Sequence, residues 1–172
     1  TATVSLTLVA YSSGLHRIGP EDEIVVSIAE HHSNMLPWRM VARQTGATLR
    51  YLECRTDGSL PMAELEAKIT HKTALVAVAQ VSNVFGRTNP MEAIIDLAHK
   101  HGAVVVMDAA QSAPHMPIYV QALGVDFVAF SGHKQMCPMG IGVLWGRHEL
   151  LDAMPPMLTG GEMIDSVTEQ DA

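Results

Sequence analysis

The sequence is poor in cysteine and in positive charge, and each shortage narrows the range of functions. Cys54 and Cys137 lie far apart without CxxC spacing, which argues against a disulfide framework and against a cysteine zinc site. Eleven Lys and Arg residues against eighteen Asp and Glu residues give a formal net charge of −7, which repels nucleic-acid phosphates and anionic membranes. No apolar run approaches the roughly 20 residues of a membrane-spanning helix. These absences predict a cytoplasmic protein with a small-molecule substrate or partner.

Apolar side chains make up 48% of the 172 residues, enough to bury a core, and we expect one domain over residues 1–172. Strand-like and helix-like patterns alternate, which predicts an α/β fold with three layers, α/β/α, around a mostly parallel mixed sheet. The predicted strands are 24–29, 48–52, 74–80, 104–107, 126–130 and 141–145. The last strand follows its predecessor too closely for a crossover helix and is expected to be antiparallel.

The predicted helices have recognisable starts and stops. They cover 3–16, 36–45 with Ser33 or Asn34 as the cap, 62–69, and a segment that Asn89 caps, Pro90 opens and Gly102 ends. The acidic stretch 168–172 is expected to be unstructured.

Four of the predicted strands end in polar clusters, at residues 30–34, 82–83, 108–111 and 131–134. Because the carboxyl ends of parallel strands meet at one edge of a sheet, we expect the four clusters to lie together. That edge is where open α/β sheets bind ligands. A lysine, a carboxylate and a small hydroxyl brought together there supply a Schiff-base amine, a partner for a pyridinium nitrogen and a phosphate ligand. The pattern therefore predicts a pyridoxal phosphate site.

Individual residues in these clusters suit individual tasks. Lys134 is the candidate amine, and Asp108 is the candidate carboxylate that keeps a pyridine nitrogen protonated. Gln111 is placed to reach a ring hydroxyl. His31 can stack on a flat cofactor and carry a proton near neutral pH.

Each residue also has an ordinary interpretation. Lys134 suits a solvated loop, Asp108 suits a helix or turn cap, and His31 suits an exposed surface. The histidines offer no H-x-x-x-H or H-x-x-E-H spacing, so a metal site is disfavoured. The convergence of the four clusters favours the functional interpretation over the ordinary one.

With these residues in view, the chain resembles the class V aminotransferase group of fold type I pyridoxal phosphate enzymes. Within that group it is most similar to cysteine desulfurases of the SufS and CsdA type. The resemblance extends over nearly all of the chain and depends on the order and spacing of several runs. These are Ala29-Glu30-His31-His32-Ser33-Asn34 with Pro37-Trp38, Val81-Ser82-Asn83-Val84, Asp108-Ala109-Ala110-Gln111, and Ser131-Gly132-His133-Lys134 with Gly140-Ile141-Gly142.

The resemblance implies a role for each matching residue. Lys134 would hold the cofactor covalently, Asp108 would contact the pyridinium nitrogen, Gln111 the ring oxygen, and His31 would stack over the ring. Both Lys134 and His31 would then be catalytic.

The remaining matches concern the phosphate and the substrate. Thr3, Ser131 and His133 match positions that bind the phosphate, and Asn83 matches the residue that orients substrate and cofactor. Two departures stand out. Thr1-Ala2-Thr3-Val4 replaces the family's usual Gly-Thr-Thr-Glu, and Cys137-Pro138-Met139-Gly140 replaces Gly-Pro-Thr-Gly.

Taken as a whole, the resemblance implies that residues 1–172 are the central part of a cofactor-binding large domain, with a C-terminal small domain outside this chain. The parent enzyme would convert L-cysteine to L-alanine for iron–sulfur cluster assembly, as a homodimer with a sulfur-acceptor protein. Its persulfide-forming cysteine and carboxylate-binding arginine would lie beyond the chain, which alone would be catalytically incomplete. The alternatives are a selenocysteine lyase, an epimerase or a transaminase of the same group, and a non-catalytic binding domain with the same fold.

Overall fold

The computed structural model describes residues 1–161, and a six-stranded sheet in the order β2-β1-β3-β4-β5-β6 forms its centre. The stretch 162–172, with the tail predicted to be unstructured, lies outside the described residues. Neighbouring strands pair in parallel, except that β6 pairs antiparallel with β5, as the short connection predicted. The strands are β1 (Glu23–Ser27), β2 (Thr48–Leu52), β3 (Thr73–Ala79), β4 (Val104–Asp108), β5 (Phe127–Ser131) and β6 (Gly142–Gly146).

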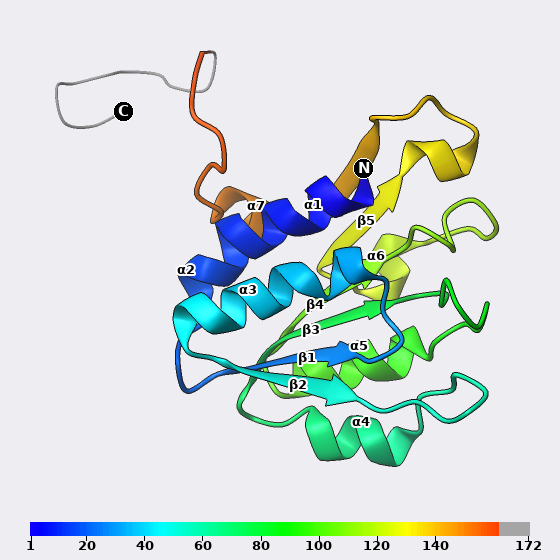
Figure 1. Cartoon of the computed structure of the whole chain (residues 1–172). Coiled ribbons are helices and arrows are strands. Elements are labelled where there is room, and N and C mark those ends of the chain that lie inside the picture. Colours follow the sequence, from blue (N-terminus) through cyan, green and yellow to red (C-terminus); the bar gives the residue numbers. More distant parts are fainter. Residues whose placement is uncertain (162–172) are drawn as a thin grey trace, which may run out of the picture.

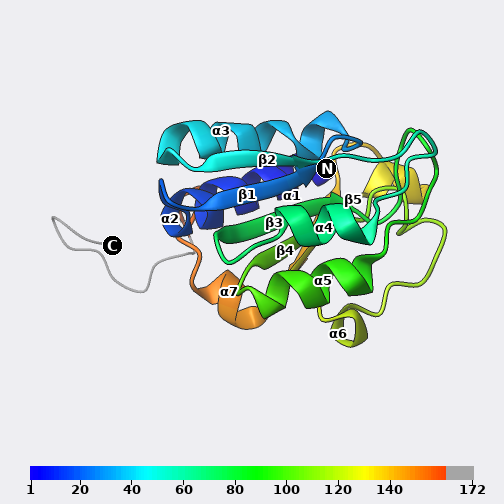
Figure 2. The same ribbon diagram turned by 90° about the horizontal axis from the view of Figure 1, so that it is seen from below.

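Helices cover both faces of the sheet and complete the predicted three layers (Figures 1 and 2). One face carries α1 (Ala2–Val9), α2 (Leu15–Arg17) and α3 (Leu36–Thr45), and the other carries α4 (Met62–Lys68), α5 (Met91–Lys100) and α6 (Val120–Leu123). A short helix, α7 (His148–Asp152), follows β6. The mostly parallel α/β/α sheet predicted from the sequence is confirmed.

Alternation along the strands divides the core in two. In β1, Ile24 and Val26 pack into the core under α1 and α3, whereas Val25 between them faces the core under α4 and α5. All five residues of β1 are buried, because both faces of the strand are covered. Trp38 of α3 and Phe127 of β5 are the bulkiest fully buried side chains of the first core.

The first predicted helix is continuous from Ala2 to Arg17 but is not uniform. A π-helical turn, Ala10–Gly14, separates α1 from α2. Gly14 lies where a Cβ atom would come within 3.1 Å of Val41 Cγ2, so the glycine lets this helix pack closely on α3. The sequence pattern carried no signal for the π-helical turn.

Two predicted helix caps are wrong. The residue that caps α3 is Met35, without a side-chain hydrogen bond, and the Asn34 side chain instead contacts Glu30 and Trp38. Likewise Asn89 does not cap α5, because its amide donates to the Ala79 carbonyl at 2.8 Å. Both asparagines are buried, where an amide must satisfy buried partners rather than a solvent-exposed helix end.

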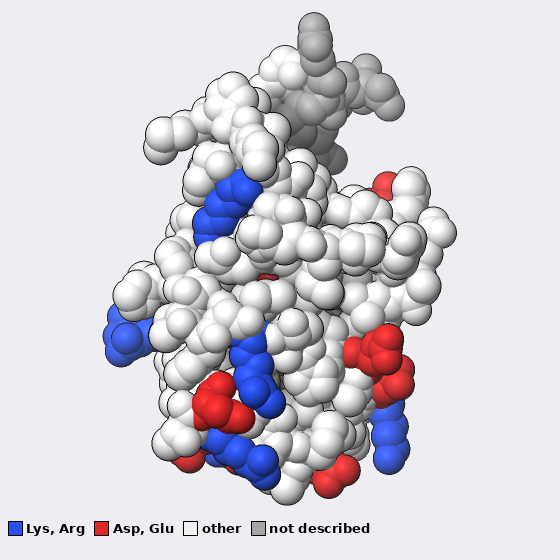
Figure 3. Space-filling view, turned by 90° about the vertical axis from the view of Figure 1, so that its right-hand side faces the viewer, with Lys and Arg blue, Asp and Glu red and all other residues white. Residues whose placement is uncertain are grey.

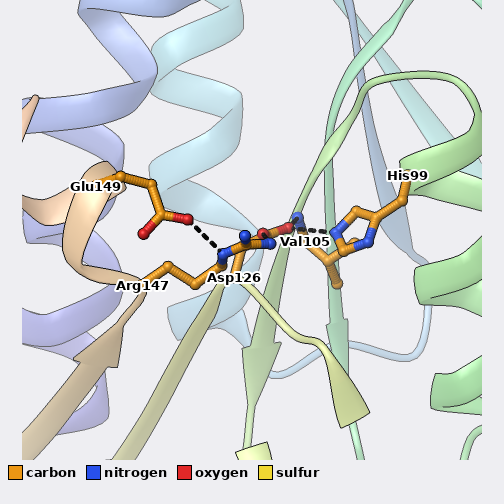
Figure 4. A network of polar contacts seen from close by, with 5 residues as sticks. All are labelled: His99, Val105, Asp126, Arg147 and Glu149. Carbon is orange, nitrogen blue, oxygen red and sulfur yellow. Dashed lines mark hydrogen bonds and ion pairs between the residues drawn. The ribbon is translucent and has the colours of Figure 1, made fainter. Parts of the chain in front are cut away.

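A polar network closes the amino edge of the sheet, the edge opposite the four clusters (Figure 4). The buried Asp126 carboxylate accepts the Val105 N–H at 2.8 Å, contacts His99 Nε2 at 2.8 Å, and lies 3.5 Å from an Arg147 nitrogen. Arg147 also donates to Glu149 at 2.7 Å. The network ties α5, β4 and the end of β6 to the start of β5.

Candidate active site

The four polar clusters converge on one cavity of about 200 Å³ at the carboxyl edge of the sheet. Figure 3 looks onto this edge, where most of the visible surface is uncharged. Parallel strands end side by side there, and Ala79 of β3 pairs in register with Asp108 of β4. The cavity is lined by Thr1, Ala2, Thr3, His31, Ser33, Ala79, Val81, Asn83, Asp108, Ala110, Gln111, Ser131, His133 and Lys134.

Asp108 ends β4 and lies 5% exposed at the bottom of this edge. Its Oδ1 accepts the Ala110 N–H at 2.8 Å, and within residues 1–161 its other oxygen has no hydrogen-bond partner. Burial raises the pKa of Asp108, while the Ala110 N–H and the charges of Lys134 and His31 oppose that rise. A buried carboxylate with one oxygen left for a partner suits a protonated ring nitrogen.

His31 lies in the loop between β1 and α3, and its ring is held by hydrogen bonds on one side. Nδ1 accepts the Ser33 N–H at 3.1 Å and lies 3.0 Å from Ser33 Oγ. Because Nδ1 is an acceptor here, the proton of the neutral ring sits on Nε2. Ser33 Oγ is in turn 2.8 Å from Thr3 Oγ1, so the histidine loop is linked to the start of α1.

The start of α1 meets the end of β5 at the cavity. The Thr1 side chain caps α1, and the Ala2 N–H donates to Ser131 Oγ at 2.7 Å, which leaves the Ser131 hydroxyl hydrogen available to another acceptor. A Cβ atom at Gly142 would lie 2.6 Å from Thr1 Cα, so only glycine permits this approach of β6 to the chain. Hydroxyl groups and the positive end of a helix dipole favour an anion.

Lys134 lies in the single 3₁₀ turn Gly132–Gln135 that follows β5. The turn is closed by the Gly132 N–H, which donates to the Ile141 carbonyl at 3.0 Å, and by the Cys137 N–H, which donates to the Gly132 carbonyl at 3.1 Å. The lysine is half-buried beside the exposed His133, and both line the cavity. An amine, a carboxylate, an imidazole and the start of α1 thus surround one space.

The structure brings all eight predicted site residues to this cavity: Thr3, His31, Asn83, Asp108, Gln111, Ser131, His133 and Lys134. The donor set fits pyridoxal phosphate, although the role of each residue toward the cofactor stays a prediction. Cys54 packs beside the core and Cys137 is exposed, and neither lines the cavity. Within residues 1–161 no group of His, Cys, Asp and Glu side chains is arranged to hold a metal ion.

Sequence reasoning assigned no role to Glu30, which the structure places under the cavity wall. The sequence shows a charged residue directly before His31 and His32, but the pattern does not indicate whether its side chain points into the protein. Within residues 1–161, no helix is both long enough and apolar enough to cross a membrane.

Comparison with known proteins agrees with this fold. The family model described as aminotransferase class-V matches residues 1–172, and the chain belongs to this family. A probable cysteine desulfurase of Halalkalibacterium halodurans is 51% identical over 170 residues, which is 99% of this chain and 42% of that protein. The chain therefore spans less than half the length of this relative.

Solved structures agree with the sequence match. The cysteine desulfurase CsdA of Escherichia coli superposes with a TM-score of 0.95 at 45% identity, covering 99% of this chain and 43% of that one. A C-DES mutant with glycine covalently linked to its pyridoxal phosphate cofactor superposes with a TM-score of 0.82 at 25% identity, covering 92% of this chain and 42% of that one. The fold is thus that of the fold type I pyridoxal phosphate enzymes.

Proposed function

We propose that the protein carrying this chain is a pyridoxal phosphate-dependent cysteine desulfurase, which converts L-cysteine to L-alanine and transfers the sulfur to a cysteine thiol. The observation that carries the proposal is the convergence of Lys134, Asp108 and His31 on one cavity in a chain 51% identical to a probable cysteine desulfurase. In the balanced reaction the substrate C–S bond breaks and an S–S bond forms on the enzyme. The electron pair of the C–S bond and the proton lost by the accepting thiol go to the substrate carbon, so the carbon is reduced while the two sulfurs are oxidised to the persulfide level.

When bound, the cofactor supplies an electron sink for the charge that develops on the substrate carbons. Asp108 would hold a proton on the ring nitrogen by charge attraction, and Gln111 would bind the ring oxygen. Lys134 would hold the cofactor and could move protons at the substrate carbons. His31 would lie against the ring and could carry a proton through Nε2, because Ser33 occupies its other ring nitrogen.

The other lining residues bind and orient. Thr3, Ser131 and His133 hold the phosphate at the start of α1, and Asn83 orients the substrate. We assign the sulfur-accepting cysteine to a part of the protein outside this chain, because neither Cys54 nor Cys137 lines the cavity. Residues 1–172 are then the central part of the large domain, catalytically incomplete alone, with the small domain elsewhere.

The proposal also includes an oligomeric state, a cellular location and a sulfur acceptor. Met136, Met139 and Ile141 are strongly exposed beside the lysine loop, which supports a homodimer that covers them. The enzyme would work in the cytoplasm and pass its sulfur to an acceptor protein for iron–sulfur cluster assembly.

The test is covalent trapping at Lys134. The protein is mixed with pyridoxal phosphate, reduced with borohydride and mapped by mass spectrometry, together with Lys134→Ala and the matched surface variant Lys100→Ala. We expect a single adduct on Lys134, lost in Lys134→Ala and kept in Lys100→Ala. Adducts scattered over surface lysines would contradict the site, and a full-length protein that forms no alanine from L-cysteine would contradict the reaction.

A further inference from the structure

Glu30 lies directly before His31 and is buried, with 7% of its surface exposed. Its Oε2 accepts two hydrogen bonds, from the Ala79 N–H at 2.9 Å and from Asn34 Nδ2 at 2.6 Å. One carboxyl oxygen thus joins the histidine loop to the end of β3, 49 residues further along the chain.

The Ala79 contact replaces a missing strand partner. Pairing between β1 and β3 ends at Val26 and Ala77, whereas β3 continues to Ala79. On the other side β3 remains paired with β4, where Ala79 lies in register with Asp108. Because N–H groups alternate between the two sides of a strand, the Ala79 N–H points to the side that β1 has left, and Glu30 satisfies it there.

The two hydrogen bonds of Glu30 form a bridge between Ala79 and Asn34, and the Asn34 end of this bridge is also fixed. Asn34 Oδ1 accepts the Trp38 Nε1–H at 3.1 Å, and both side chains are fully buried. The Asn34 amide therefore donates to Glu30 and accepts from Trp38 in one defined orientation. The loop that carries His31 is held between α3 and the sheet edge that carries Asp108.

We propose that Glu30 is a positioning residue that sets His31 against Asp108 across the cofactor cavity, through its bridge between the histidine loop and Ala79. The inference rests on the proposed function, because it concerns where the two residues meet the cofactor ring. Burial, chiefly, raises the pKa of Glu30 to about 8, and the charge of Asp108 acts in the same direction. A protonated Glu30 keeps its bridge without placing a second negative charge beside Asp108.

The test compares variants of the full-length holoenzyme. Glu30→Ala removes the bridge, Glu30→Asp is one methylene shorter, and Glu30→Gln keeps the acceptor oxygen and the neutral charge. Glu66→Ala, at an exposed position on α4, is the matched control. Two quantities are measured, the dissociation constant for pyridoxal phosphate and the visible circular dichroism of the bound cofactor. Each variant is also made with His31→Ala.

We expect Glu30→Ala and Glu30→Asp to raise the dissociation constant about tenfold and to change the dichroism per bound cofactor. Glu30→Gln should restore both, and Glu66→Ala should change neither. In the His31→Ala background the effect of Glu30→Ala should fall below about twofold, because the two residues act together. If Glu30→Ala does not fold, the same comparison is made with Glu30→Asp.

Equal effects of Glu30→Ala with and without His31, or no effect at all, would overturn the inference while leaving the proposed function intact. A Glu30→Gln variant as impaired as Glu30→Ala would overturn it too. An unmodified protein that binds no cofactor at Lys134 would remove the proposed function, and this inference with it.

Discussion

Glu30 makes the stability of the protein depend on pH in an unusual direction. Burial raises its pKa from 4.5 to about 8, so between these pH values the folded protein keeps a proton that the unfolded chain has released. The folded state binds more protons than the unfolded state in this window, so the free energy of unfolding falls as the pH rises. The contribution of Glu30 is fully present below pH 4.5 and is lost once the pH has passed about 8.

The size of the effect follows from that pKa difference. Each pH unit inside the window lowers the free energy of unfolding by about 1.4 kcal/mol, and the whole window by about 5 kcal/mol. Glu30→Gln removes the titration while keeping the acceptor for Ala79 and Asn34. Relative to the unmodified protein, this variant should therefore become more stable by about 1.4 kcal/mol for each unit of pH rise.

Urea unfolding of both proteins at several pH values between about 5 and 8 measures this difference. Other titrating groups, Asp108 among them, are present in both proteins, so most of their contribution cancels when one curve is subtracted from the other. A difference that stays constant with pH would show that Glu30 is already ionised in the folded protein and would refute the reasoning. A Glu66→Gln variant, exposed on α4, carries the same substitution at a surface position and serves as the control.

Further substitutions test the two edges of the sheet. Asp126→Ala should lower the free energy of unfolding by about 3 kcal/mol in urea, because it leaves the buried Val105 N–H unpaired, whereas His99→Gln should cost less. Gly142→Ala places a Cβ atom against the Thr1 backbone, so it should weaken pyridoxal phosphate binding in a fluorescence titration, with the uncrowded Gly161→Ala as control. Unchanged stability or unchanged binding, respectively, would contradict these assignments.

The sheet was predictable because its signals are local. A strand buried on both faces, such as residues 104–108, is an apolar run that ends at the first charged residue, so its extent and its site residue are found together. The prediction that the four polar clusters lie together followed from the parallel pairing of the strands alone. It needed no information about side-chain contacts.

The parts that sequence reasoning missed depend on contacts distant in sequence. Asn34 and Asn89 look like helix caps, yet their partners are a buried carboxyl and the carbonyl of Ala79, residues that only the folded sheet brings near. Glu30 was missed for the same reason, because its second partner lies 49 residues away. A local pattern cannot distinguish a polar residue that ends an element from one that joins two elements.

Glu30 and Asp108 are buried carboxyl groups near the same edge of the sheet, and they differ in what they contact. Desolvation raises the pKa of both groups, so burial alone does not separate them. Asp108 has the positive charges of Lys134 and His31 to oppose that rise, whereas the charge that acts on Glu30 is that of Asp108 itself, which adds to it. For Glu30, burial outweighs the opposing hydrogen bonds from Ala79 and Asn34 and raises the pKa to about 8, whereas for Asp108 the Ala110 N–H opposes the rise together with those two charges. Glu30 directs its hydrogen-bonded oxygen to Ala79 and Asn34 inside the protein, whereas Asp108 keeps one oxygen for a partner in the cavity, so the two carboxyl groups do not compete for the same contacts.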